Sequence, residues 1–433
     1  CCGGLSFRRI DYIALQKVRR GQMACSKELR IPKEWKKLHH DIVNEAIDPE
    51  LFNEDEIFEW LKATKLCHDR ALVSKYTWAI RPYHFMRYEI PLLPNSPLCR
   101  EVFKIWVHFT HTIFVTDDIT EDFDQSEVQE LCDAFEELDN KITKQFPRLP
   151  SLAEMKQILI EKNVSRNVIP HVLMNTDPLV STAKSLLNHG NFPQDDVKDF
   201  WRRMTVSTSC YLSSLKVKYI TSPSVTASDV FWIRSLNGDA VTWLHVVEII
   251  SGAIGKVTAH LPLLTQLIIL CATFCLGVND IYSFQREKAG EVKCLNYVKV
   301  LAETNDVLDE ADVVENVVRS LNALIKVIYH KIEKAKQENP DSLELGKMLD
   351  GIGAATAGWY FFHHYSPRYK DTQWRLNLVD VPEKVLEEWR RWDGEVSEKE
   401  IKNALYDYNP NVKKVIDQII SGKICNLDKL LQL

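Results

Sequence analysis

The chain has 433 residues, a formal net charge of −6 and a pI near 6.2, and no basic stripe runs along it. This charge balance argues against nucleic acids and anionic membrane surfaces as partners. Apolar residues make up 45% of the chain, whereas glycine (15) and proline (17) are scarce. Long stretches without helix breakers favour a mainly helical protein with a large core.

Helical periodicity runs along most of the chain, and no segment alternates in the manner of a strand. The spacing predicts helices over residues 57–66, 101–115, 127–146, 200–220 and 313–328, separated by proline-containing breaks at 91–97, 147–150, 221–224, 340 and 367. We therefore expect a disordered tail over residues 1–30, one helical domain over 31–380, and a helical extension over 381–433 packed on that domain.

The most apolar window is Leu261–Val278. About 18 to 20 apolar residues can cross a membrane, so a membrane span is one interpretation. Pro262 and Gln266 lie inside the window and a polar run follows it directly, which favours a buried central helix.

The cysteines and the first residues indicate the compartment. The eleven cysteines are an odd number, and their scatter does not fit a secreted disulfide framework. Residues 1–9 lack a basic region followed by an apolar core, the pattern of a signal peptide. We expect a cytoplasmic protein.

A first acidic motif ends the apolar run from Ile105 to Val115. Asp117 and Glu121 are four residues apart, about 40° around a helix axis, with Asp118 beside them. Carboxylates at the inner end of an apolar helix need positive compensation, and a hard cation such as magnesium provides it. The alternative is a solvated helix terminus.

A second motif follows the most apolar helix. Asn279, Ser283 and Glu287 are spaced four and four, on one stripe about 12 Å long. An amide oxygen, a hydroxyl and a carboxylate in a row make an oxygen site for a cation. The alternative is a helix that simply emerges into water.

The two motifs together resemble those of class I terpene cyclases of the microbial type. The aspartate-rich motif of that family is matched by Asp117, Asp118 and Glu121. Its NSE motif is matched by Asn279, Asp280, Ser283, Arg286 and Glu287. The resemblance covers roughly residues 31–380. It implies an all-α fold, a single-domain helical bundle around a central apolar active-site cavity.

Two further features agree with this resemblance. Arg234 lies 45 residues before Asn279, at the place of the family's diphosphate-sensing arginine, and Asn237 and Gly238 follow at its linker and effector positions. Arg368 and Tyr369 match the Arg-Tyr pair that ends the family core. The usual tryptophan six residues before that arginine is replaced by Phe362, with Trp359 three residues earlier.

The resemblance implies a mechanism. Two sets of oxygen ligands, Asp117, Asp118 and Glu121 on one side and Asn279, Ser283 and Glu287 on the other, would hold three Mg²⁺ ions, with Mn²⁺ as a substitute. Three arginines and a tyrosine would contact the diphosphate of the substrate: Arg234, Arg286, Arg368 and Tyr369. Candidate aromatic side chains to stabilise the allylic cation are Phe109, Phe114, Phe274, Trp359 and Phe362.

The expected activity is ionisation of a linear isoprenyl diphosphate and cyclisation to a cyclic terpene with release of diphosphate (a carbon–oxygen lyase acting on phosphates). The motifs leave farnesyl and geranylgeranyl diphosphate open as substrates, and a similarity to octocoral cyclases favours the latter. A prenyl diphosphate synthase would need a second aspartate-rich motif where Asn279 and Ser283 stand. A non-catalytic protein that binds isoprenyl diphosphates is the alternative from another class. Related cyclases often form dimers, so a homodimer is an expectation, whereas stable membrane insertion is not.

Overall fold

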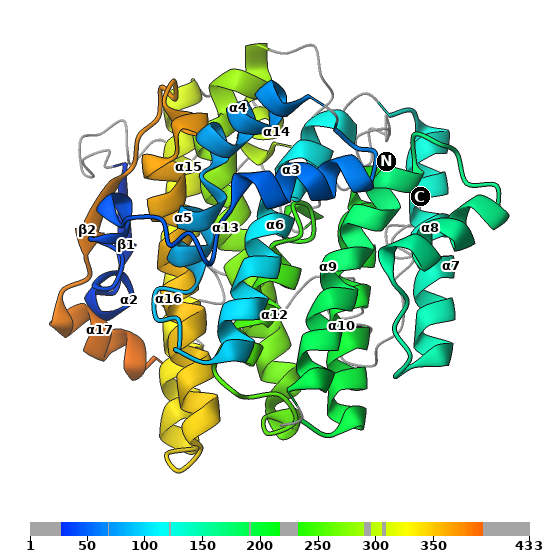
Figure 1. Cartoon of the computed structure of the whole chain (residues 1–433). Helices are drawn as coiled ribbons and strands as arrows, with labels where there is room; N and C mark the ends of the chain where they lie inside the picture. The colour runs from blue at the N-terminus through cyan, green and yellow to red at the C-terminus, as the bar shows by residue number, and fades with distance from the viewer. Residues whose placement is uncertain are drawn as a thin grey trace, which may run out of the picture.

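The structure is a bundle of mostly parallel and antiparallel helices (Figure 1). This computed structural model describes residues 27–67, 69–120, 123–189, 192–216, 233–289, 296–304 and 309–392, and gives the backbone alone for 117–120, 289 and 304. The helices are α2 (Lys33–Lys36), α3 (Glu54–Ala63), α4 (Arg70–Ile80), α5 (Pro82–Glu89), α6 (Pro97–Thr120), α7 (Gln125–Gln145), α8 (Leu152–Glu161), α9 (Ile169–Asn188), α10 (Gln194–Ser214), α12 (Ala240–Ile250), α13 (Leu261–Ala289), α14 (Tyr297–Thr304), α15 (Glu310–Glu338), α16 (Leu343–Tyr365) and α17 (Glu383–Arg390). Three short 3-10 turns, η1 (Ile42–Asn44), η3 (Thr258–His260) and η4 (Pro367–Tyr369), and two strands, β1 (Glu28–Ile31) and β2 (Asn377–Asp380), complete the described elements.

Helix α13 is the central helix of the bundle, in contact with α12, α14, α15 and α16. Within the described part of the chain, the segment Thr258–Lys288 is the one helix long and apolar enough to cross a membrane. Its most apolar window is 78% buried inside the protein. A helix that is apolar on all sides is expected in the core of a large protein, and the buried position favours that interpretation over a membrane span.

Helix α15 confirms the predicted amphipathic pattern. The eight apolar residues predicted to share a face are all 0–2% exposed: Val313, Val314, Val317, Val318, Leu321, Leu324, Ile325 and Ile328. Asp309 precedes the helix and its side chain accepts a hydrogen bond from the amide of Asp312, which satisfies one of the free amides of the first turn.

The predicted proline breaks also mark helix ends. The break at 91–97 separates α5 from α6, and the break at 147–150 separates α7 from α8. Helix α7 begins with a capping box, in which Asp124 accepts from the amide of Glu127 and Glu127 accepts from the amide of Asp124. Such reciprocal bonds fix where a helix begins.

The prediction of a tail over residues 1–30 is wrong at its end. Residues Glu28–Ile31 form β1, which pairs in parallel with β2 at one edge of the bundle (Figure 1). Leu29 and Ile31 are fully buried, and Asn322 on α15 hydrogen bonds to the backbone of the strand on both sides, at Arg30 N (2.8 Å) and Glu28 O (2.9 Å). Residues 1–26 lie outside the described part.

The described start of the C-terminal extension packs on the same core. Trp389 of α17 lies with its ring centroid 5.9 Å from that of Tyr329 on α15, and its carbonyl is 2.9 Å from His330 Nδ1. Arg390 places its guanidinium 5.6 Å above the Tyr329 ring. Residues 393–433 lie outside the described part.

Candidate active site

The candidate site lies along the C-terminal half of α13. Asn279, Ser283 and Glu287 follow one another at four-residue intervals, so their side chains form one stripe on the helix. Ser283 is 1% exposed, and the Glu287 side chain is 14% exposed. Asn279 and Glu287 are thus partly exposed at the two ends of the stripe, and Ser283 between them is buried.

The amide of Asn279 is held in a defined orientation. Its Nδ2 donates to the Tyr369 hydroxyl (2.8 Å) and lies 3.1 Å from His363 Nε2. His363 Nδ1 is 2.7 Å from the Trp359 carbonyl, which can only accept, so Nδ1 carries the proton and Nε2 accepts from Asn279. The amide oxygen of Asn279 is thereby turned toward Arg234, whose Nη2 donates to it at 3.1 Å.

His363 is a neutral imidazole in this arrangement. Burial is the largest cause that lowers its pKa from 6.5 to about 3; the hydrogen bond to Trp359 raises it, whereas the charges of Arg368 and Arg234 lower it further. The ring therefore keeps one accepting nitrogen at any pH near neutrality, and the orientation of Asn279 does not depend on a proton.

Arg234 forms a buried ion pair with Asp280. Its Nε and Nη2 donate to the same carboxylate oxygen at 2.9 and 2.6 Å, and the other oxygen accepts from the amide of Tyr297 at 2.8 Å. Burial raises the pKa of Asp280 to about 6, and Arg234 opposes that rise. Asp280 thus fixes the arginine beside the Asn279 amide.

Asn296 is a site residue that the sequence interpretation missed. Its Nδ2 lies within hydrogen-bond distance of Glu287 Oε2 (2.7 Å), Ser283 Oγ (3.3 Å) and the Asp280 carbonyl (3.0 Å). This fully buried amide holds two of the candidate ligands in register. Nothing in its local sequence signals the role, because it stands in no repeated spacing with the motif.

The break before α12 has the form predicted for residues 234–239. Gly238 has φ +93° and Asp239 has φ +58°, and α12 begins at Ala240. A Cβ at residue 238 would stand 3.0 Å from Leu276 Cδ1 on α13. Asn237 accepts a hydrogen bond from Arg234 and donates to Ser214 Oγ at 3.2 Å, so it joins the break to α10.

Arg368 and Tyr369 lie between the two motif-bearing helices. Tyr369 bonds to Asn279 on α13, and its ring packs on His363 and Phe362 of α16, with centroids 4.7 and 5.9 Å away. The guanidinium of Arg368 lies 5.2 Å above the ring of Phe114 on α6. Phe114 is three residues before Asp117, so the C-terminal end of α6 and the stripe of α13 face one another across this pair.

Not every predicted residue can be placed. The side chains of Asp117 and Asp118 and the whole of Glu121 lie outside the described part of the structure. Arg286 is 47% exposed and its Nη2 is 3.5 Å from a Glu287 carboxylate oxygen, so it stands at the outer end of the stripe.

An aromatic cluster packs beneath the stripe. Phe85 on α5 is its centre, with ring centroids at 4.6 Å from Phe362, 5.2 Å from Trp359, 4.9 Å from Trp243 and 6.1 Å from Phe114. Phe109 joins through Trp243 at 6.0 Å. The cluster thus holds four of the five predicted aromatic residues and two, Phe85 and Trp243, that were not predicted. No ring contact between described residues joins Phe274 to it.

The α13 stripe supplies oxygen atoms of three kinds: an amide, a hydroxyl and a carboxylate. Hard divalent cations prefer such ligands, so the residues fit magnesium. No cluster of three or more histidine, cysteine, aspartate or glutamate side chains suited to a metal occurs among the residues the structure describes.

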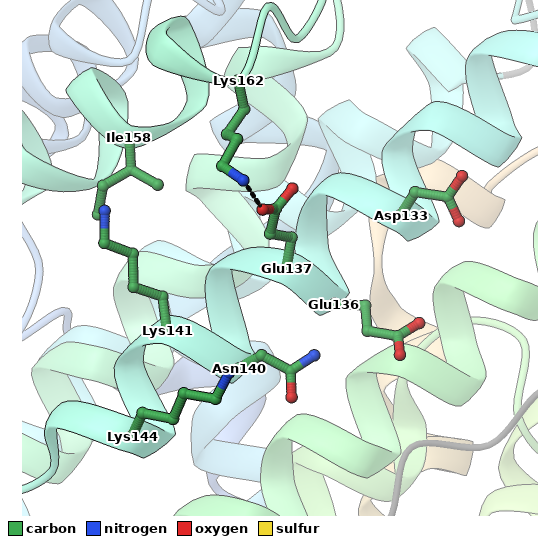
Figure 2. Close-up of a pocket in the computed structure, with 8 residues that line it drawn as sticks. All are labelled: Asp133, Glu136, Glu137, Asn140, Lys141, Lys144, Ile158 and Lys162. Atoms are coloured by element: carbon green, nitrogen blue, oxygen red, sulfur yellow. Dashed lines mark ion pairs between the residues drawn. The ribbon is translucent and has the colours of Figure 1, made fainter.

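A hollow lies away from the α13 stripe, on the outer face of α7 and α8 (Figure 2). Its lining is mostly charged and includes an ion pair between Lys162 and Glu137. It is open to solvent and contains one apolar side chain, Ile158. Such a surface cannot keep water from a reactive hydrocarbon, and it is not a candidate active site.

Comparisons with known proteins identify the family and the fold. The profile of the family described as "Terpene synthase family 2, C-terminal metal binding" matches residues 108–326. A comparison with curated proteins gives no match. The fold is similar to a single-residue variant of cucumene synthase (TM-score 0.52, 15% identity, covering 79% of this chain and 98% of that one) and to wild-type cucumene synthase (0.51, 15%, 77% and 97%). It is also similar to the SVS_A2 protein from ancestral sequence reconstruction (0.50, 15%, 85% and 97%).

Proposed function

Because this chain belongs to terpene synthase family 2, the class I terpene synthases of microbial type, we propose that it ionises a linear isoprenyl diphosphate and cyclises the cation. The observation that carries the proposal is the joint position of the Asn279–Ser283–Glu287 stripe and Arg234, above the aromatic cluster centred on Phe85. Such an arrangement separates a polar end suited to diphosphate from an apolar end suited to a hydrocarbon.

The stripe would hold magnesium on one wall and Asp117, Asp118 and Glu121 on the other. Bound magnesium supplies neutralisation of the charge that builds up on the leaving group. Three ions are expected, with Mn²⁺ as a substitute. The residues around Asn279 prepare this wall: Asn296 aligns Ser283 and Glu287, while His363 and Tyr369 turn the Asn279 oxygen toward Arg234.

Arginines from three elements would bind the diphosphate. Arg234, Arg286 and Arg368 can each donate charged hydrogen bonds to several oxygens, and the Tyr369 hydroxyl adds a further donor. As the carbon–oxygen bond breaks, its electron pair goes to the diphosphate oxygen and the positive charge stays on the allylic carbon. Aromatic faces stabilise such a cation by about 0.5–2 kcal/mol each without reacting with it.

Geranylgeranyl diphosphate is the substrate we favour over farnesyl diphosphate, because of the similarity to octocoral cyclases. The reaction class is then a carbon–oxygen lyase acting on phosphates, and the product is a cyclic diterpene. We also propose that the protein is cytoplasmic and that it forms a homodimer. Gel filtration with light scattering on the full chain would test the dimer.

In the decisive experiment, the purified protein is mixed with magnesium and either farnesyl or geranylgeranyl diphosphate. Diphosphate release and volatile products are measured together. Asn279→Ala should lower product formation about 100-fold, the order found when one group that stabilises developing charge is removed, and Asp117→Ala should do the same. Asn322→Ala, at the β1 edge, is the matched control and should retain activity. Tight binding of either substrate with no cyclic hydrocarbon or alcohol would favour the non-catalytic binder instead.

A further inference from the structure

Glu89, at the end of α5, is a buried acid with no hydrogen-bond partner in the part of the chain that the structure describes. The residue is 3% exposed, and neither carboxyl oxygen has a hydrogen-bond partner among the described residues. Burial raises its pKa well above the ordinary value, which favours the protonated form of the carboxyl. A buried carboxyl with no hydrogen-bond partner among the described residues makes no structural contact that accounts for its position.

The carboxyl is close enough to α13 for its charge to influence two buried thiols on that helix. Cys275 and Cys271 stand four and eight residues before Asn279, so they share its face of the helix, about 6 and 12 Å deeper. Burial raises the pKa of both thiols, and the proximity of Glu89 raises each further. Glu89 is therefore near the helix that bears the candidate metal ligands, beside its fully buried cysteines.

The same face of α5 leads to the aromatic cluster. Phe85, its centre, is one helical turn before Glu89. Helix α5 also packs closely on α16, where a Cβ at Gly358 would stand 2.0 Å from the Tyr88 carbonyl. Figure 1 shows α5 and α16 side by side. Glu89 is thus one helical turn from the aromatic cluster that is the apolar part of the candidate site.

Other buried acids of the described chain have assigned partners. Asp280 pairs with Arg234, Asp239 accepts from Thr242, and Asp139 accepts from Thr143. Each of these contacts holds the carboxyl within the protein framework. Glu89 differs because, within the described residues, both of its oxygens are uncommitted.

We propose that Glu89 is a proton-transfer residue for the hydrocarbon. It acts on a neutral cyclic intermediate, which forms when the released diphosphate takes a proton from a C–H beside the first cyclic cation and the electron pair of that C–H bond becomes a double bond. This inference rests on the proposed function. The carboxyl O–H breaks and leaves its electron pair on oxygen, while the π pair of a carbon–carbon double bond forms the new C–H bond. The adjacent carbon becomes cationic. At the end of the reaction the Glu89 carboxylate takes a proton from a C–H bond beside the final cation. The electron pair of that bond then forms the double bond of the product.

Deuterium oxide tests the proposal directly. The Glu89 proton exchanges with solvent between turnovers, so the wild-type cyclic product made with magnesium and geranylgeranyl or farnesyl diphosphate in D₂O should contain one deuterium. Glu89→Gln keeps the shape but has no acidic proton. Its products should carry at least tenfold less deuterium and should include a less cyclised or isomeric hydrocarbon, while diphosphate release continues.

Asp139→Asn is the matched control, a buried acid changed to its amide between α7 and α10, and should retain the label. A wild-type product without deuterium, or a Glu89→Gln product that keeps it, overturns the proposal. If circular dichroism shows Glu89→Gln unfolded, Glu89→Asp replaces it: withdrawal of the carboxyl by one methylene should lower the labelled fraction, and an unchanged fraction overturns the proposal. Failure of the proposed function would give a different result: the wild type would show no magnesium-dependent release of diphosphate.

Discussion

The residues around the α13 stripe show how buried polar groups define one orientation of a ligand set. Asn279 is turned by a neutral histidine and a tyrosine, and Ser283 and Glu287 are held by the Asn296 amide, directly before α14. Each of these partners is buried, where a hydrogen bond is strong and an unmade one is costly. Ligands oriented in this way need little rearrangement when a cation binds.

Asn296→Ala should therefore weaken magnesium binding. Loss of a group that orients metal ligands costs roughly 10–100-fold in metal affinity or activity. We expect the magnesium concentration for half-maximal diphosphate release to rise by about that factor. Asn322→Ala, the same change at the β1 edge, should leave the magnesium titration as in the wild type, and equal curves for both variants would contradict the assigned role.

Sequence spacing predicted the residues that belong to one helix, and it failed for those brought in from elsewhere. Asn279, Ser283 and Glu287 were found because four-residue intervals place them on one stripe. Asn296, Phe85 and Trp243 come from other elements, and no periodicity links them to the motif. Phe274 was included because it is close in sequence to the Asn279 motif. It is one residue before Cys275, so it lies about 100° around the helix from the face that Cys275 shares with Asn279.

At the scale of elements, the break before α12 depends on one glycine. Gly238 adopts φ +93°, a conformation that residues with a Cβ avoid, and it lies close to Leu276. The predicted helix interruption is thus explained by backbone geometry and by the close approach of α13. The β1–β2 pair was missed because four residues are too few to show alternation, and its partner lies near the other end of the chain.

Gly238→Ala should destabilise the protein by about 1–2 kcal/mol, the cost of forcing an L-residue into the left-handed region. Product formation should fall as well, because Asn237 and Arg234 flank the strained position. Gly346→Ala is the matched control: this glycine lies in α16 with no atom within 4 Å of an added Cβ. Replacing glycine by alanine in a helix interior raises the free energy of unfolding by about 0.5–1 kcal/mol. Urea unfolding of both variants would measure the difference, and equal midpoints would contradict the strain.

For the whole molecule, one hydrophobic core joins nearly all described elements, from Leu29 to Trp389. Helix α17 closes that core beside α15. Trp389→Ala should lower the free energy of unfolding by about 3 kcal/mol, as for other large aromatic truncations in a core, with no change in the product profile. Trp78→Ala is the control, since Trp78 is 59% exposed on α4, and its effect should stay within about 0.5 kcal/mol. A similar loss in both would contradict the packing argument.

Acid should destabilise the bundle through its buried histidines. Burial lowers the pKa of His111 from 6.5 to about 4, with the hydrogen bond to the Val73 carbonyl opposing the change. The folded pKa is below the unfolded one, so the stability is fully present above pH 6.5 and is lost as the pH falls toward 4. At pH 5 this single group costs about 2 kcal/mol. Wild type should lose that much more than His111→Gln between pH 7.5 and pH 5 in urea unfolding, and equal losses would refute the assignment.

The strand pair at the edge of the bundle also sets when the protein can finish folding. Glu28 meets Asn377 across the sheet, so β1 has no partner until almost the whole domain has left the ribosome. At about 5–20 residues per second, that wait is on the order of 20–70 s. Throughout it Leu29 and Ile31, buried in the finished molecule, stay uncovered and available to chaperones.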